Sequence, residues 1–347
     1  MARFADLGEQ GFIDLVAGLS RPLSPRPVVG IGDDAAVLSL PPRARAVLTT
    51  DLLAEGIHFR TGTTPARLLG RKALSVNLSD IAAMGGAPHS CVVSIGFPRG
   101  TPIAYARELA RGLVSQARRY GVAIAGGDTS AARSLFLSVA LVGVVEPGRQ
   151  VGRGGARPGE VLFVTGTLGG SAAGLKLLRA GVRRSGAPRG RGPGAAARLR
   201  RHTARLIRRH LDPIPRVLAG RALGLSGLAT AMIDLSDGLA RDLSRLCRAS
   251  RAGAVIEAAA IPVDRSARAV LGRRRALRLA LAGGEDYELL FAARSEHAPL
   301  VRRLSRRLGV PMSRIGQILP ARHGIRVLRT DGRYAALPRG GFEHFPR

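Results

Sequence analysis

Apolar residues along the chain follow two spacings, one typical of strands and one typical of helices. Two segments, residues 65–85 and 237–249, place apolar residues three and four positions apart, which predicts a helix in each. Short apolar runs predict strands. These runs are residues 45–50, 91–97, 122–126, 134–145 and 160–165. The pattern indicates a mixed α/β protein.

Acidic residues stand where these predicted elements end. The strands at 45–50 and 122–126 run into Asp51 and into Gly127-Asp128, so we expect carboxylates at strand ends. Asp80 falls on the apolar face of the helix 65–85, in phase with Leu69 and Ala73. A carboxylate there is costly to bury unless it is paired or binds a metal.

The segment "MIDLSDGL" places three polar residues at the start of the second helix. Leu239, Leu243, Leu246 and Cys247 would face inward, so Asp234, Ser236 and Asp237 lie at a strand-to-helix junction. Taken singly, such residues are as typical of helix caps and turns as of a functional site.

Twelve of the 24 acidic residues fall in six short segments that are rich in Gly, Ser, Thr or Asn. Carboxylate and hydroxyl oxygens are the ligands that Mg²⁺ prefers, usually shared with water and substrate phosphates. The clustering therefore favours a magnesium site for phosphate chemistry over isolated caps. The segments "GTLGGSAAGLK" and "GIGDDA" lack the residue order of a Walker A loop and of a dinucleotide-binding loop.

Length and composition predict a folded protein of two domains, since the chain has 347 residues, of which 46% are hydrophobic. No apolar stretch is long enough to span a membrane and the N-terminus does not resemble a signal peptide, so we expect a cytoplasmic location. Cys91 and Cys247 sit in apolar runs and are expected to be buried free thiols.

The formal net charge of +30 comes almost entirely from arginine. The arginines are scattered and aromatic residues make up only 4% of the chain, so the charge favours a basic surface over a specific nucleic-acid site. Binding to a polyanion remains a minority alternative. Residues 179–202 are rich in Arg, Gly and Ala and are expected to form a flexible surface excursion.

Nine segments together resemble the thiamine-monophosphate kinase family, part of the aminoimidazole ribonucleotide synthetase-like superfamily. They include "GIGDDAAVL", "TTDLLAEGIHF", "NLSDIAAMGG", "RRHLDPIPR", "IDLSDGL" and "GGEDYELLF". The resemblance implies an α/β fold with mixed sheets in two domains. Residues 1–153 would form the domain that binds ATP and Mg²⁺ and dimerises, and residues 154–347 would complete the active site.

The activity implied by the resemblance is ATP-dependent phosphorylation of thiamine monophosphate to thiamine diphosphate by direct in-line transfer, in a homodimer that uses several Mg²⁺ ions. It also implies a role for each matching residue. The metal ligands would be Asp34, Thr49, Thr50, Asp51, Asp80, Asp128, Asp234 and Asp237. The ATP contacts would be Gly127, Asp128, Arg153 and Ser236. The contacts to thiamine monophosphate would be His58, Glu285 and Phe342.

Asp33 and Asp286 are expected to be structural partners of their neighbours. The acceptor is a phosphate oxygen that is largely deprotonated at neutral pH, so no general base is expected. The alternatives are another ATP-using member of the superfamily, such as aminoimidazole ribonucleotide synthetase, and a non-enzymatic polyanion binder. Selenophosphate synthetase is disfavoured, because no Cys precedes "GIGDDA".

Overall fold

The computed structural model describes the chain except for residues 1–2, 22, 33, 183–192 and 339–347. Contacts within it divide the chain into two compact units, Met1–Ile81 with Gly86–Gly148, and Ala82–Gly85 with Arg149–Arg347. In the described residues, no helix is long and apolar enough to cross a membrane.

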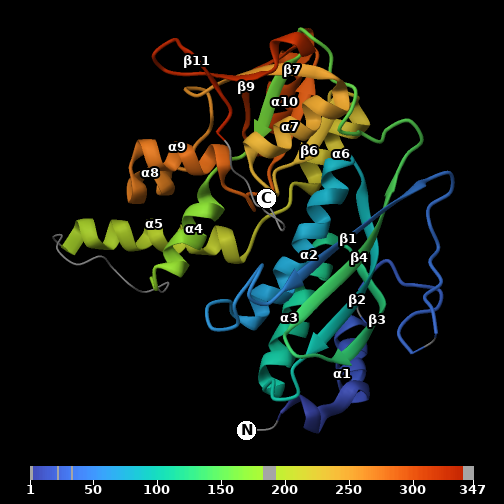
Figure 1. The fold of residues 1–347 in the computed structure, drawn as a ribbon. Helices are drawn as coiled ribbons and strands as arrows, with labels where there is room; N and C mark the ends of the chain where they lie inside the picture. The colour runs from blue at the N-terminus through green and yellow to red at the C-terminus, as the bar shows by residue number, and fades with distance from the viewer. Residues whose placement is uncertain (1–2, 22, 33, 183–192, 339–347) are drawn as a thin grey trace. The chain divides into compact units, whose positions relative to one another are not determined.

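The first unit contains a four-stranded sheet with the order β1-β4-β2-β3 (Figure 1). The strands are β1 (Arg45–Ala54), β2 (Ala87–Phe97), β3 (Ala123–Ala131) and β4 (Phe136–Val145). β4 pairs antiparallel with both β1 and β2, whereas β3 pairs parallel with β2. β3 is therefore an edge strand.

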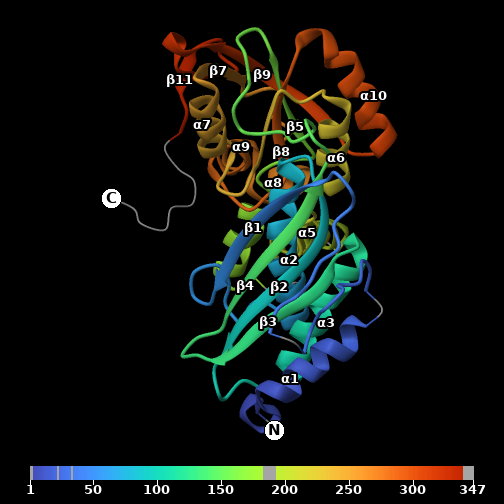
Figure 2. The same cartoon turned by 90° about the vertical axis from the view of Figure 1, so that its right-hand side faces the viewer.

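One face of this sheet is covered by helices and the other is open. Figure 2 shows α2 (Ala66–Ala83) and α3 (Ile103–Tyr120) behind the sheet, with α1 (Phe4–Ser20) near its end. The burial of β4 alternates along its length, as expected of a strand with one covered face. The open face carries Leu48, Leu52 and Val92, which are 72%, 51% and 40% exposed.

Glycines allow α2 and α3 to pack closely. A Cβ atom at Gly70 of α2 would collide with the carbonyl oxygen of Leu109, and one at Gly112 of α3 would collide with that of Arg67. Each helix thus uses a glycine to admit the backbone of the other. This approach fixes the position of α2, which carries Asp80.

The second unit is built on a seven-stranded mixed sheet in the described part of the chain, with the order β11-β10-β7-β9-β5-β8-β6. Its strands are β5 (Val161–Thr165), β6 (Ala231–Asp234), β7 (Ala252–Glu257), β8 (Leu289–Ala293), β9 (Met312–Pro320), β10 (Ile325–Leu328) and β11 (Tyr334–Ala336). The helices are α4 (Gly170–Arg179), α5 (Pro193–Leu211), α6 (Val217–Ser226), α7 (Leu239–Ser250), α8 (Arg265–Leu271), α9 (Arg273–Ala282) and α10 (Ala298–Leu308).

Helices cover this second sheet on both faces. Figure 2 shows α7 and α10 on opposite sides of it. One face contributes Leu162 and Val164 of β5 to a core with residues of α7 and α9. On the other face Phe163 and Phe291 stack with ring centroids 5.4 Å apart. The strands of this sheet are therefore apolar on both sides, and β5 and β8 are buried throughout.

Most predicted elements are present, and the structure corrects two details. The strand expected at 45–50 continues to Ala54 and the one at 122–126 continues to Ala131, so Asp51 and Asp128 lie within strands and not at their ends. The reason is backbone pairing: β1 is hydrogen-bonded to β4 over its full length, and such a ladder tolerates polar side chains.

The second correction concerns the excursion expected at residues 179–202. Its last part, from Pro193, belongs to α5, while residues 183–192 lie outside the described structure. Ala and Arg are good helix formers, and α5 buries Leu206, Ile207 and Leu211. Both cysteines are buried free thiols, as predicted, and burial raises the pKa of each to about 12.

We predict that Gly112→Ala destabilises the protein by about 1–3 kcal/mol, because the added methyl group forces α2 and α3 apart. The matched control is Gly18→Ala in α1, where no atom lies within 4 Å of the added carbon. Removing this helical glycine should raise stability by up to about 1 kcal/mol. Thermal unfolding of both variants checks the pair, and equal melting temperatures would contradict the proposed close approach.

Candidate active site

In the first unit, β1 and α2 bring together two of the predicted metal ligands. The hydroxyl of Thr49 donates a hydrogen bond of 2.5 Å to Oδ2 of Asp80. Strand alternation places Thr49 and Asp51 on the helix-covered face of β1, and Thr50 on its open face. Asp80 is half-buried and accepts this hydrogen bond, so the free-energy cost of burying a carboxylate on the apolar face of the helix is reduced.

The segment "GGD" lies in the edge strand β3. Gly127 has φ +158°, and a Cβ atom there would collide with the carbonyl oxygen of Val93, so only glycine fits this approach to β2. Asp128 is exposed and pairs in register with Ser94. By alternation, its side chain is on the open face of the sheet, together with Thr50.

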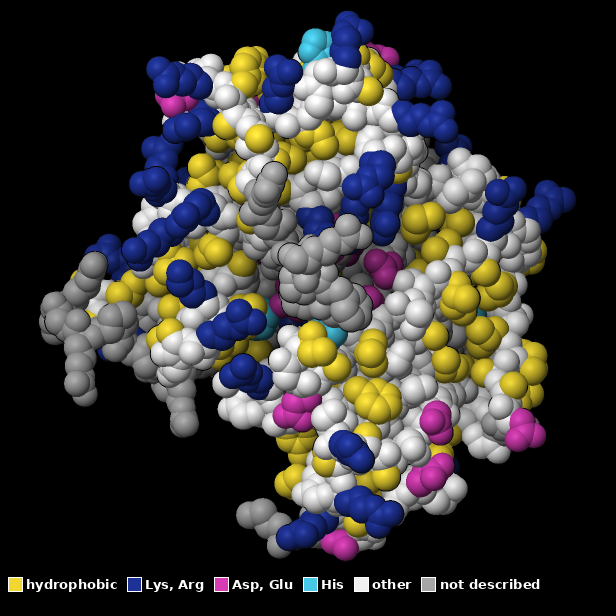
Figure 3. All heavy atoms as spheres, viewed as in Figure 1, with side chains coloured by type: hydrophobic (Ala, Val, Ile, Leu, Met, Phe, Trp, Pro, Cys, Tyr) yellow, Lys and Arg dark blue, Asp and Glu magenta, His cyan; other side chains and the backbone are white. Residues whose placement is uncertain are grey.

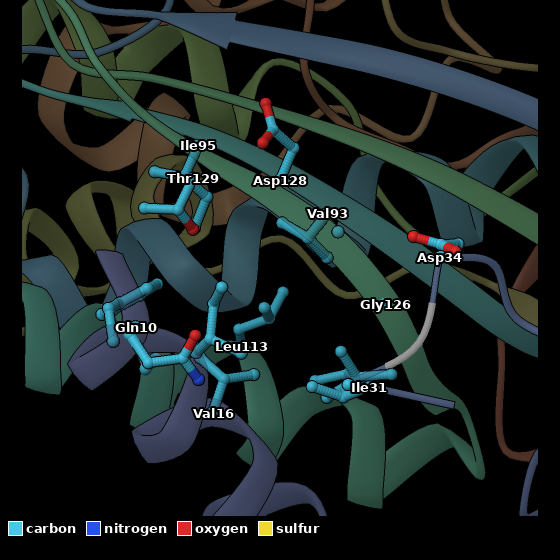
Figure 4. A pocket seen from close by; sticks show the side chains of 16 residues that line it. Gln10, Val16, Ile31, Asp34, Val93, Ile95, Leu113, Gly126, Asp128 and Thr129 are labelled. Atoms are coloured by element: carbon cyan, nitrogen blue, oxygen red, sulfur yellow. The ribbon is translucent and has the colours of Figure 1, made fainter. Parts of the chain in front are cut away.

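A cavity of about 530 Å³ lies beside this edge strand (Figure 4). Its walls are largely apolar and come from α1, α3, β2 and β3, with Val16, Leu113 and Ile95 among them. Asp34 and Asp128 also border it. Figure 4 shows Asp128 and Thr129 pointing to different sides of β3. The cavity thus has a largely apolar interior bordered by Asp34, Gly127 and Asp128, and the side chain of Asp128 points to the open face of the sheet.

His58 lies in the turn after β1. Its Nδ1 accepts a hydrogen bond of 3.0 Å from the backbone N–H of Ala54, so in its neutral form the ring carries its hydrogen on Nε2. The backbone N–H of His58 donates to the carbonyl oxygen of the same Ala54, at 2.9 Å. Nearby, the hydroxyl of Thr61 donates to Oε1 of Glu55 at 2.5 Å. The turn therefore fixes the orientation of the imidazole.

In the second unit, backbone hydrogen bonds join the two motifs "IDLSDG" and "GGEDYEL". The N–H of Leu235 donates to the carbonyl of Glu288, at 2.8 Å, and the N–H of Tyr287 donates to that of Leu235, at 3.0 Å. The N–H of Glu285 donates to the carbonyl of Ser236, at 2.7 Å. Segments about 50 positions apart thus lie side by side, as the extension of the β6–β8 pairing.

The first of these motifs continues into α7, where Asp242 holds the turn. Its Oδ2 accepts hydrogen bonds of 3.0 Å from the N–H groups of Asp237 and Gly238. Arg245 contacts Oδ1 of Asp242 at 2.9 Å and Oδ2 of Asp237 at 2.5 Å. Burial raises the pKa of Asp242 to about 6 and the charge of Asp237 adds to the rise, while Arg245 and the two N–H groups oppose it.

The second motif is anchored by two buried acids that flank Tyr287. Asp286 accepts hydrogen bonds from the N–H groups of Gly169, at 2.6 Å, and Ser171, at 3.1 Å, where α4 begins. Glu288 receives two hydrogen bonds of 2.6 Å from Arg216. Asp286 is a structural residue, as predicted, but its partners are the N–H groups of Gly169 and Ser171 and not its neighbours in sequence.

Glu285 directly precedes these anchors, with a side chain that is 23% exposed and a backbone at φ +64°. Its Oε2 lies 3.0 Å from Nδ1 of His210. His210 and Arg216 lie in a segment that resembles the family, but the sequence assigned neither residue a role. Their signal was the polar, proline-containing stretch "RRHLDPIPR", which spans the end of α5 and the residues after it.

The remaining predicted residues are placed as follows. Asp234 ends β6 and is buried, whereas Arg153 is exposed and its carbonyl accepts a hydrogen bond from Ser250. Asp33 and Phe342 lie outside the described residues. Within the described part of the chain, no three His, Cys, Asp or Glu side chains converge as a metal-binding group.

The donor set of the first unit nevertheless suits Mg²⁺. Asp34, Asp80 and Asp128 offer carboxylate oxygens and Thr49 offers a hydroxyl oxygen, which are hard ligands of the kind that Mg²⁺ takes alongside water and phosphate. The hydrogen bond from Thr49 holds Asp80 in one orientation, and the cavity beside Asp34 and Asp128 leaves room for a ligand.

Comparison with known proteins identifies relatives over the whole of this architecture. Residues 32–145 match the model of the AIR synthase related protein N-terminal domain, and residues 157–329 match that of its C-terminal domain. Thiamine-monophosphate kinase of Escherichia coli (strain K12) is 37% identical over 91% of this chain and 92% of its own length.

Two solved structures are also similar. Thiamine-monophosphate kinase from Stenotrophomonas maltophilia K279a has a TM-score of 0.81 and 34% identity, covering 93% of this chain and 96% of that one. AaThiL, in complex with AMPPCP and TMP, has a TM-score of 0.73 and 32% identity, covering 99% of each chain.

We predict that protonation of Asp286 stabilises the fold. Burial raises the pKa of Asp286 to about 6, above its ordinary value near 3.9, so the folded chain takes up a proton before the unfolded chain does as the pH falls. The free energy of unfolding of the wild type, relative to Asp286→Asn, should therefore rise by about 1 kcal/mol between pH 7 and pH 5. Denaturant unfolding at several pH values measures this difference, and a fall over the same range would refute it.

Proposed function

The chain belongs to the thiamine-monophosphate kinase family, and we propose that the residues described above carry out the reaction of that family. The enzyme transfers the γ-phosphoryl group of ATP to thiamine monophosphate, giving ADP and thiamine diphosphate. The observation that carries the residue assignment is the pairing of "IDLSDG" with "GGEDYEL", which places the proposed phosphate and acceptor residues on adjacent backbone.

The proposed nucleotide residues, apart from Ser236, belong to residues 1–153. The apolar walls of the cavity suit a nucleobase, and Gly127 leaves backbone accessible at its edge. Asp34, Thr50 and Asp128 are proposed ligands of Mg²⁺, and of these Thr50 and Asp128 lie on the open face of the sheet. The Thr49–Asp80 pair and Asp51 are proposed ligands of a separate Mg²⁺ on the helix-covered face. When bound, Mg²⁺ would neutralise phosphate charge that these carboxylates would otherwise repel.

The proposed acceptor residues belong mainly to residues 154–347. Thiamine monophosphate carries a cationic ring system with an amino group and an anionic phosphate. The carboxylate of Glu285, whose backbone N–H is bonded to Ser236, suits the cationic part. Asp234 and Asp237 would hold further Mg²⁺, with Ser236 and Arg153 as contacts to ATP. In the first unit, His58, whose ring is oriented by the hydrogen bond to its Nδ1, would be a further contact to the acceptor.

Catalysis by these residues is positioning. The acceptor oxygen is largely ionised at neutral pH, so the chain needs no side chain that abstracts a proton. The anchors Asp242, Asp286 and Glu288 hold the two paired motifs, so that the groups that contact substrate are fixed before substrate binds. Bringing two phosphorylated molecules into line is then the main contribution of the protein.

The alternatives from the sequence receive less support. An aminoimidazole ribonucleotide synthetase is not favoured, because the relatives matched over most of the chain are thiamine-monophosphate kinases. A polyanion-binding role finds no support in the face shown in Figure 3, where Lys and Arg side chains are spread over the surface. The expected cytoplasmic location stays a prediction.

We also propose a homodimer formed through the open face of the first sheet. Leu48, Leu52 and Val92 share this face and are substantially exposed, which is unusual for large apolar side chains of a strand. A second copy of the same face would bury them, because a two-fold axis places identical patches against each other.

We predict that turnover requires ATP, thiamine monophosphate and a divalent cation. A coupled assay for ADP should show turnover with thiamine monophosphate and none with formylglycinamidine ribonucleotide. Asp80→Asn should lower kcat by orders of magnitude at limiting Mg²⁺, because the amide keeps the shape and loses the charge. The control Asp331→Asn, at an exposed turn, should behave as the wild type. Normal turnover of Asp80→Asn would exclude the metal role.

A second kinetic prediction separates acceptor from donor. Glu285→Gln should raise KM for thiamine monophosphate roughly tenfold and change KM for ATP little, because a neutral amide pairs less well with a cationic acceptor. Initial rates with each substrate varied in turn measure both constants. A change confined to the ATP constant would place Glu285 on the nucleotide side.

A further inference from the structure

A buried histidine of α5 holds the carboxylate that is proposed to bind the acceptor. Nδ1 of His210 lies 3.0 Å from Oε2 of Glu285, and the side chains are 5% and 23% exposed. We propose that His210 is a positioning residue that orients Glu285 toward thiamine monophosphate. This inference rests on the proposed function, because it assigns to His210 the control of acceptor affinity.

The chemistry of the contact fixes which ring nitrogen carries a hydrogen. An ionised carboxylate can only accept hydrogen bonds, so Nδ1 of His210 must be the donor to Glu285. The hydroxyl oxygen of Ser171 lies 3.2 Å from the same Nδ1 and is therefore an acceptor toward it. Ser171 belongs to the first turn of α4, and its own N–H donates to Asp286. The same turn thus anchors Asp286 directly and Glu285 through His210.

The backbone alone does not determine where the carboxylate of Glu285 points. Its N–H is held by Ser236 and its φ of +64° is fixed, but a glutamate side chain retains three rotatable bonds. Ordering such a side chain costs conformational entropy, and a ligand that must do so binds more weakly. His210 orders this side chain in the free enzyme. Its contribution should therefore be seen in acceptor affinity.

Apolar residues of α5, besides this histidine, pack the helix against its surroundings. Leu206, Ile207 and Leu211 of the same helix are at most 2% exposed and supply its apolar contacts. A second histidine on the helix, His202, hydrogen-bonds to the hydroxyl of Ser266 at 3.0 Å and does not contact Glu285. Replacing His202 thus removes a comparable hydrogen bond from the same helix and provides a matched control.

The test compares His210→Ala, His210→Asn and His202→Ala in the coupled assay. His210→Ala should raise KM for thiamine monophosphate roughly tenfold or more, as expected for loss of a hydrogen bond to a charged group, with KM for ATP unchanged. His210→Asn should recover most of the affinity, because the asparagine Nδ2 can donate from nearly the position of Nδ1. His202→Ala should leave both constants near those of the wild type.

A double-mutant cycle separates positioning from a general structural effect. If His210 acts through Glu285, adding His210→Ala to Glu285→Gln should raise KM for thiamine monophosphate little further. Three results would each overturn the inference while leaving the kinase assignment intact. The first is a double mutant whose rise in KM for thiamine monophosphate is the product of the two single rises. The others are equal effects of the His210 and His202 variants, and failure of His210→Asn to recover affinity. Absence of turnover with thiamine monophosphate in the wild type would instead overturn the proposed function, and the role of His210 with it.

Discussion

A carboxylate that is removed from water must be paired, because burial of an uncompensated charge costs more than a folded chain can tolerate. In the second unit this requirement organises the proposed site. Glu288 binds Arg216 through two hydrogen bonds, and Asp286 accepts the N–H groups at the start of α4. Asp242 accepts the N–H groups of the turn before α7. Each buried acid therefore ties a loop to a neighbouring element.

The clustering of acids in a chain of +30 charge thus has two causes. Some of the acids shape the loops, and the others are proposed to meet the ligands. In "GGEDYEL" the two kinds stand next to each other, since Glu285 is presented and Asp286 and Glu288, which follow it, are anchors. The tight turns this requires are visible at Glu285 and Tyr287, which both have positive φ although neither is glycine. Strain of this kind persists only where surrounding contacts enforce it.

In the first unit, the proposed oxygen ligands lie on a sheet that helices cover on one face only. Because side chains alternate along a strand, consecutive residues of β1 serve opposite faces. Thr49 meets Asp80 of the packed helix α2, while Thr50 lies on the open face with Asp128. The close approach of α2 and α3, which Gly70 and Gly112 permit, keeps Asp80 within reach of β1.

The sequence by itself determined the α/β class, the helices α2 and α7, the strands β1 to β5 and the family, because apolar spacing and short motifs are local properties of the chain. Local pattern could not show that β1 and β3 continue past Asp51 and Asp128, since strand length depends on a partner strand distant in sequence. It also could not assign His210 or Arg216, whose roles arise from contacts with residues more than 70 positions away. Only the tertiary structure decides which acids are anchors and which are presented, because burial and pairing are properties of the packed chain.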